Sequence, residues 1–243
     1  AQAAEGVLRV SMELGGNAPF VVFEDADLDK AVDGAMLAKF RNIGQACTAA
    51  NRFIVHESIA DEFAARITER VQGMKVGRGT DEGVQIGPLV EPKAVANAVR
   101  LVEEAVAAGA VVTTGGKAIE GAGSFFEPTV IDRVSADMSV SVEEIFGPVV
   151  GIQRFATEEE AVALANATEY GLVGYVFTQD AARGQRMIDL IDTGMMGLNV
   201  GVVSNAAGPF GGVKQSGLGR EGGAEGIYEY LETKYTLMPS PYA

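Results

Sequence analysis

The chain of 243 residues carries 19 basic and 33 acidic side chains, a net charge of −14, and is 47% hydrophobic. This composition is typical of a globular protein, and the length suffices for a buried core in one large or two small domains. The negative charge repels phosphate backbones and anionic lipid headgroups, which argues against nucleic-acid binding and a membrane-surface role. Neither a spanning apolar run nor an export signal is visible, so a cytoplasmic protein is expected.

Short β-rich runs predict six strands, at residues 19–23, 53–56, 110–113, 126–130, 149–155 and 173–178. Helical periodicity lies between them. A first helix is predicted over 59–74, with Ser58 as its N-cap, and a second over 95–106, with Gly109 as its C-terminal stop. Thr157 and Glu160 form the pattern of a capping box for a third helix, which runs through Asn166.

Strands that alternate with crossover helices predict an α/β fold, in which helices cover both faces of a mostly parallel sheet. Two glycine-rich stretches, at 115–123 and 201–223, are interpreted as loops. Residues 227–238 are expected to form a short helix or strand that leaves the core and contacts another chain.

Cys47 is the only cysteine, which excludes an intramolecular disulfide and a thiolate metal cluster, and no metal site is expected. A lone cysteine is more often a small buried hydrophobe, but Cys47 follows a glycine-containing turn and offers the best side-chain nucleophile of the chain. Glu13 lies at the end of a β-like run over 7–14, just before a glycine pair; taken alone, an exposed carboxylate at a strand end is the better interpretation.

Two further sequence features are weaker indications of a functional site. Gly217, Gly219 and Gly222 form a literal G-x-G-x-x-G, but no apolar strand precedes it and the chain ends too soon afterwards, so we interpret it as a loop. His56 is the only histidine, nine residues after Cys47; a Cys-His dyad is conceivable, but a surface histidine at a strand end is favoured.

Five ordered motifs together resemble the aldehyde dehydrogenase superfamily: ELGGNAP at 13–19, FRNIGQAC at 40–47, EIFGP at 144–148, NATEYGL at 166–172 and PFGGVKQSGLGRE at 209–221. The family's chains are roughly twice as long, and the resemblance implies that the half that binds the nucleotide is absent here. It implies a connecting strand at 1–15, a catalytic domain at 16–215 and a C-terminal tail for homo-oligomer contacts at 216–243.

The resemblance also assigns roles. Cys47 matches the nucleophile and Glu13 the general base, for which a partly desolvated position and a raised pKa are expected. Glu144, Phe146 and Leu14 match residues that bind the cofactor, NAD or NADP. The side-chain donor to the oxyanion would come from the half that is absent, so the isolated chain is expected to transfer hydride poorly.

Three features narrow the substrate: Arg41 six residues before Cys47, Asn17 where lysine is commoner in the family, and Val203-Ser204-Asn205. Together they resemble the succinate-semialdehyde dehydrogenase group, in which the positions of Arg41 and Ser204 bind the distal carboxylate of the substrate; Phe210 is a further expected substrate contact. From spacing alone, a surface ion pair at Arg41 is equally acceptable.

Three alternatives stay open. One is the same reaction on another aldehyde, such as glutarate semialdehyde, which is longer by one methylene. Another is cofactor-independent thiol esterase or acyl-transferase activity of Cys47 and Glu13. The third is an inert domain whose tail serves only in assembly.

Overall fold

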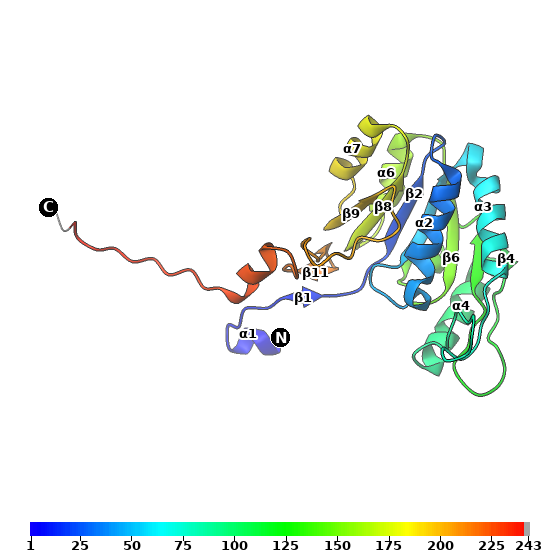
Figure 1. Cartoon of the computed structure of the whole chain (residues 1–243), viewed down its shortest axis with the longest axis horizontal. Helices are drawn as coiled ribbons and strands as arrows, with labels where there is room; N and C mark the ends of the chain where they lie inside the picture. The colour runs from blue at the N-terminus through cyan, green and yellow to red at the C-terminus, as the bar shows by residue number, and fades with distance from the viewer. Residues whose placement is uncertain (241–243) are drawn as a thin grey trace.

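A seven-stranded sheet in the order β4-β5-β6-β3-β2-β8-β9 forms the centre of the computed structural model, which describes residues 1–240 (Figure 1). Every neighbouring pair is parallel except β4 and β5. The strands span Ala18–Val22 (β2), Ala50–His56 (β3), Val111–Thr114 (β4), Thr129–Asp132 (β5), Val149–Phe155 (β6), Val173–Phe177 (β8) and Met195–Leu198 (β9).

Helices cover both faces of this sheet. The main apolar cluster lies under α2 (Leu28–Phe40) and α3 (Glu57–Gln72), which pack on Phe20 and Phe53. Alternate residues of the same strands face the other way, toward α4, α5, α6 and α7. These helices span Pro92–Ala107 (α4), Ser139–Val142 (α5), Glu158–Asn166 (α6) and Ala181–Leu190 (α7). Because both faces are covered, every residue of β2 is buried.

The predicted α/β fold is confirmed, with local corrections. The N-cap of α3 is His56, not Ser58: the His56 ring accepts a hydrogen bond from the Ser58 backbone N–H, because β3 runs directly into the helix. The strand predicted over 126–130 begins only at Thr129, since the residues before it form a separate bridge. The capping box is present, with the Thr157 hydroxyl accepting from the Glu160 N–H.

Two arms leave the sheet on one side (Figure 1). The first holds α1 (Gln2–Glu5) and β1 (Met12–Glu13), so the β-like run over 7–14 yields only two strand residues. The second holds β10 (Val213–Lys214), β11 (Gly217–Leu218) and the short helix η2 (Glu225–Tyr230). Strand β1 pairs with β11, and β10 pairs with β7 (Tyr170–Gly171).

The end of the chain extends away from the body, as predicted, but forms neither helix nor strand after Tyr230 within the described residues (Figure 1). Residues 241–243 of the expected oligomerisation tail lie outside the described residues. Among the helices described, none has the length and apolarity to cross a membrane.

Candidate active site

Three loops meet at one edge of the sheet, where the parallel strands β2, β3 and β6 begin. Residues 13–17 lead into β2, residues 44–49 into β3 and residues 144–148 into β6. Because neighbouring parallel strands start at the same edge, these loops are brought together although they are far apart in sequence. The edge therefore carries Glu13, Cys47 and Glu144.

Gly15 and Gly16 allow these loops to approach closely. A Cβ atom on Gly15 would lie 2.5 Å from Glu144 Oε2, and one on Gly16 would lie 2.5 Å from the carbonyl oxygen of Cys47. The Gly16 N–H donates to Glu144 Oε1 at 3.0 Å. The glycine pair thus fits the space between the cysteine loop and the Glu144 carboxylate, which no larger residue could enter without moving them.

Cys47 is half-buried, and its electrostatic surroundings favour the thiol form. Burial raises the pKa of Cys47, the Glu13 carboxylate raises it further, and Glu144 adds to the effect. The backbone N–H groups of Cys47 and Thr48 act in the opposite direction, because they donate toward the sulfur. Cys47 and Glu13 lie on the loops that lead into the neighbouring strands β3 and β2, and a base beside Cys47 would favour formation of the thiolate.

Glu13 is exposed at the end of β1, yet partial desolvation raises its pKa. Glu221 raises this pKa further, and Arg220 lowers it. The direction is the one expected for a general base that must accept and release a proton near neutral pH.

Alkylation of Cys47 by iodoacetamide is expected to show the coupling between these two groups. The rate should rise with pH with a midpoint above that of a cysteine peptide, because the neighbouring carboxylates disfavour the thiolate. In Glu13→Gln the midpoint should move down, since one of those negative charges is gone. Glu57→Gln, at the opposite edge of the sheet, should leave the midpoint unchanged. An unshifted midpoint in Glu13→Gln would show that the two side chains do not interact.

Ser216 fixes the segment that carries Glu13. It is fully buried, and its hydroxyl donates to the Gly15 carbonyl at 2.8 Å and accepts from the Gly171 N–H. Its own carbonyl accepts from the Leu14 N–H at 3.1 Å. No sequence feature singled out Ser216, although it lies within the motif at 209–221.

Arg41 and Ser204 come together from separate parts of the chain. Arg41 follows α2 in the tight turn η1 (Arg41–Gly44), and one guanidinium nitrogen donates to Ser204 Oγ at 3.3 Å. Among residues 1–240 Arg41 makes no ion pair. Phe210 closes the loop after Ser204 through a two-way backbone bridge with Glu221.

Tyr175 lies behind this region. Its hydroxyl donates to the Thr48 carbonyl at 2.8 Å, and burial raises the pKa of Tyr175 to about 12. Arg41 lowers the pKa of this phenol and Cys47 raises it. Arg41 and Cys47 both lie on the segment that joins α2 to β3. No sequence signal singled out Tyr175, because its position on β8 follows an ordinary buried pattern.

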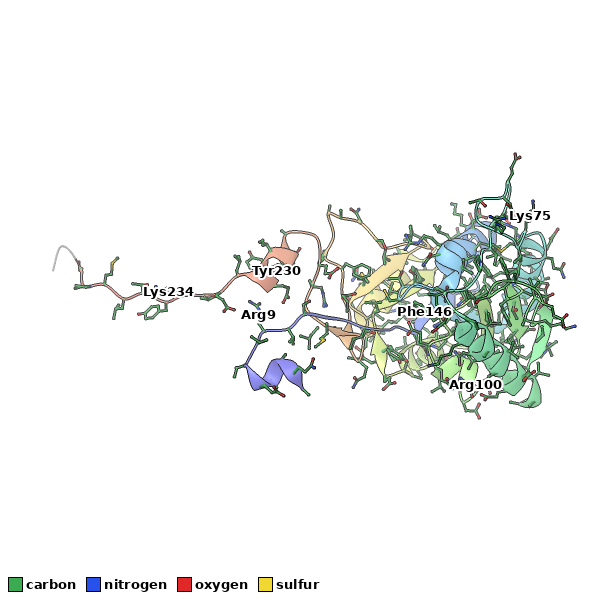
Figure 2. All side chains as sticks on the ribbon, turned by 90° about the horizontal axis from the view of Figure 1, so that it is seen from below. Arg9, Lys75, Arg100, Phe146, Tyr230 and Lys234 are labelled. Carbon is green, nitrogen blue, oxygen red and sulfur yellow. The ribbon has the colours of Figure 1, made fainter. Side chains whose placement is uncertain are left out.

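Leu14, Glu144 and Phe146 make a mixed apolar and acidic surface next to these groups. Leu14 is 47% exposed and Phe146 is 41% exposed. Figure 2 labels Phe146 on the body of the molecule. Phe146 also has a positive φ of 48°, which is uncommon for an aromatic residue and frequent at functional sites. Burial raises the pKa of Glu144, whereas the Gly16 N–H and Lys39 lower it.

The two weaker sequence features lie elsewhere. His56 ends the strand that Cys47 precedes, so the strand separates the two residues by roughly 20 Å at about 3.3 Å per residue, and they form no dyad. The glycines of the G-x-G-x-x-G pattern serve packing. A Cβ on Gly217, for example, would lie 1.9 Å from the Met12 carbonyl oxygen across the β1–β11 pair.

Comparison with known proteins identifies the family. The model of the aldehyde dehydrogenase family matches residues 1–236. The chain therefore belongs to the aldehyde dehydrogenase family.

Its relatives include enzymes named for semialdehydes. The chain is 55% identical to a succinate-semialdehyde dehydrogenase of Paenarthrobacter nicotinovorans, over 99% of this chain and 53% of that protein. It is 48% identical to a glutarate-semialdehyde dehydrogenase of Pseudomonas putida, over 98% and 49%. A crystal structure of an Escherichia coli NADP-dependent enzyme superposes with a TM-score of 0.95 at 48% identity, over 97% and 49%. The chain thus spans about half the length of the relatives that it matches.

Proposed function

We propose that the complete protein oxidises a short aldehyde with a distal carboxylate, succinate semialdehyde, to the acid with NAD or NADP. The observation that carries this proposal is the Arg41–Ser204 contact on the segment that continues to Cys47. A nucleophile alone would define only the class of reaction, whereas a guanidinium that has no carboxylate partner among residues 1–240 supports an anionic substrate.

The residues of this chain support a covalent mechanism. Glu13 assists removal of the Cys47 proton, and the sulfur attacks the aldehyde carbon to form a thiohemiacetal. The backbone N–H groups of Cys47 and Thr48, which donate toward the sulfur, can stabilise the developing oxyanion. Glu13 then passes that proton to solvent; after oxidation to the thioester, it takes a proton from the attacking water, and the bond from Cys47 to the acyl group breaks.

The surface of Leu14, Glu144 and Phe146 fits a nicotinamide riboside. The Glu144 carboxylate, held by the Gly16 N–H, can accept hydrogen bonds from ribose hydroxyls, and the exposed Phe146 ring can pack on the flat nicotinamide. When bound, the cofactor supplies the acceptor for the hydride of the aldehyde carbon. The adenosine half would need residues from the part of the family's length that this sequence does not cover.

The proposal is tested by mixing the complete protein with NAD or NADP and a series of aldehydes while following the absorbance of the reduced cofactor. Carboxylated C4 and C5 aldehydes should be oxidised fastest. Because a relative is named for glutarate semialdehyde, the C5 substrate is the second candidate. Ester hydrolysis without any cofactor-dependent oxidation would instead support a thiol esterase.

Replacing Arg41 by alanine should raise KM for the carboxylated aldehyde by about 10- to 150-fold, because a charge-assisted contact worth about 1.5–3 kcal/mol is lost. An uncharged aldehyde of equal length should be affected little. The ratio of the two kcat/KM values measures this effect, and the exposed Arg70→Ala on α3 provides a control. Equal losses on both substrates would remove Arg41 from the substrate pocket.

The 243 residues divide into three segments of a longer protein that forms a homo-oligomer in our proposal. We infer a connecting segment at 1–15, a catalytic domain at 16–215 and a homo-oligomerisation tail from 216 onward in a cytoplasmic enzyme. The exposed Tyr235, Leu237 and Met238 on the extended end support a contact with a second copy. The 243 residues alone should oxidise succinate semialdehyde far more slowly than the complete protein.

A further inference from the structure

A fully buried lysine lies behind the candidate site. Lys39, in the last turn of α2, is 0% exposed, and its Nζ donates to Asn51 Oδ1 at 2.8 Å. It makes no ion pair within the described residues. Burial lowers the pKa of Lys39 to about 7, although Glu144 opposes this effect. Burying an ammonium group is costly, so stability alone is a poor reason for a lysine at this position.

The bond between Lys39 and Asn51 joins the two ends of the segment that carries Cys47. This segment begins with the turn η1, in which three successive residues have positive φ: Asn42 at 55°, Ile43 at 62° and Gly44 at 74°. A β-branched residue in this region is strained, and such strain persists only where the surroundings hold it in place. Asn51 is also buried, so water does not compete for this bond.

The same turn packs on the loop that carries Glu144. A Cβ on Gly44 would lie 2.3 Å from the Gly147 carbonyl oxygen and 3.2 Å from the Lys39 carbonyl oxygen. The Glu144 carboxylate is partly buried, which disfavours its ionised form, and Lys39 is the cation that favours it. Lys39 is therefore bonded to the strand that follows the Cys47 loop, and its carbonyl lies beside the turn that packs on the Glu144 loop.

We propose that Lys39 is a positioning residue of the candidate active site, which holds the strained turn before Cys47 onto β3 and acts as the interior countercharge of Glu144. The proposal rests on the proposed function for the roles of Cys47 and Glu144. Its test, however, does not require turnover.

The main test is the double variant Lys39→Met/Asn51→Leu, which removes the charge and leaves no unpaired amide. Replacing buried polar groups by apolar ones of similar volume is often neutral or stabilising, so its urea midpoint should equal or exceed that of the wild type. Hydrogen exchange of residues 41–50 should accelerate by at least about tenfold, the effect of losing one hydrogen bond to a charged group. The dissociation constant of the complete protein for NAD or NADP should rise by a similar factor.

Met187→Ala is the matched control, because it creates a cavity under α7 in an apolar cluster that includes no residue of 41–50. It should lower the urea midpoint but leave exchange at 41–50 and cofactor affinity unchanged. Wild-type exchange and affinity in the double variant would overturn the proposal. A rise in hydrogen exchange over the whole chain, together with a lower urea midpoint, would also overturn it.

If the double variant does not fold, the variant Asn51→Asp tests the positioning role of Lys39 instead. The new carboxylate keeps the shape of the side chain and retains the bond to Lys39, so exchange at 41–50 should not accelerate. It competes with Glu144 for the lysine charge, so cofactor affinity should still fall. Unchanged affinity would contradict the countercharge role. If the wild-type complete protein bound neither NAD nor NADP, the proposed function would fail, while the exchange measurements would still test the bond to Asn51.

Discussion

In the complete protein, replacing Cys47 by alanine is expected to abolish the burst of reduced cofactor and to lower kcat by at least about 10⁴-fold. The expectation follows from chemistry and position together. Cys47 is the only thiol of the chain, and it lies between the loops of Glu13 and Glu144 with two backbone N–H groups facing its sulfur. No neighbouring side chain could replace it as a nucleophile of comparable reactivity.

The measurement is rapid mixing of enzyme, cofactor and aldehyde, with absorbance followed through the first turnover. Cys47→Ser separates nucleophilicity from size, because a hydroxyl of similar volume remains nearly un-ionised at neutral pH; it should lose nearly as much activity as alanine. Both variants should keep the wild-type urea midpoint and cofactor affinity, since the side chain is only half-buried. A stoichiometric burst in Cys47→Ala would assign covalent capture of the aldehyde to another group.

The fold was largely predictable, because the period-2 pattern of the strands and the helical periodicity are both local features of the sequence. Alternation of β-rich and amphipathic segments predicts a parallel sheet with helices on both faces, and the structure has this arrangement. Element ends were less predictable, because they depend on contacts between segments. The N-cap of α3, for instance, falls to His56, whose ring reaches the Ser58 N–H as β3 turns into the helix.

The residues of the candidate site could be predicted where they belong to a sequence motif with a known chemistry. The residues that act only through tertiary contacts could not. Cys47 and Glu13 stand out only when several motifs are taken together, because each residue alone is better explained as a buried thiol or a surface acid. Their roles, and those of Arg41 and Ser204, stay predictions. Lys39 and Ser216 carry no local signal, since a lysine near a helix end and a serine in a glycine-rich loop are usually exposed. Only the packing of α2 on β3 and of β11 on β1 shows what they contact.

Replacing Glu13 by glutamine should leave acylation largely intact and slow release of the product, so that the burst persists while the steady-state rate falls by about 10²–10⁴-fold. The amide keeps the size of the side chain but cannot accept the proton of the attacking water. Removing the charge also lowers the pKa of Cys47, which favours thiolate formation and partly offsets the loss of base assistance in acylation. The two steps should therefore respond unequally to one substitution.

Mass spectrometry of acid-quenched samples should detect an acyl group on Cys47 of Glu13→Gln that is scarce in the wild type. In the wild type, the steady-state rate should decrease as the pH falls through the raised pKa of Glu13, because the base form is lost. In Glu13→Gln this acidic limb should disappear. Glu57→Gln, beyond the opposite end of β3, should retain both the limb and the wild-type rate. Normal turnover of the thioester in Glu13→Gln would show that another group activates the water, even if Cys47 forms the thioester as proposed.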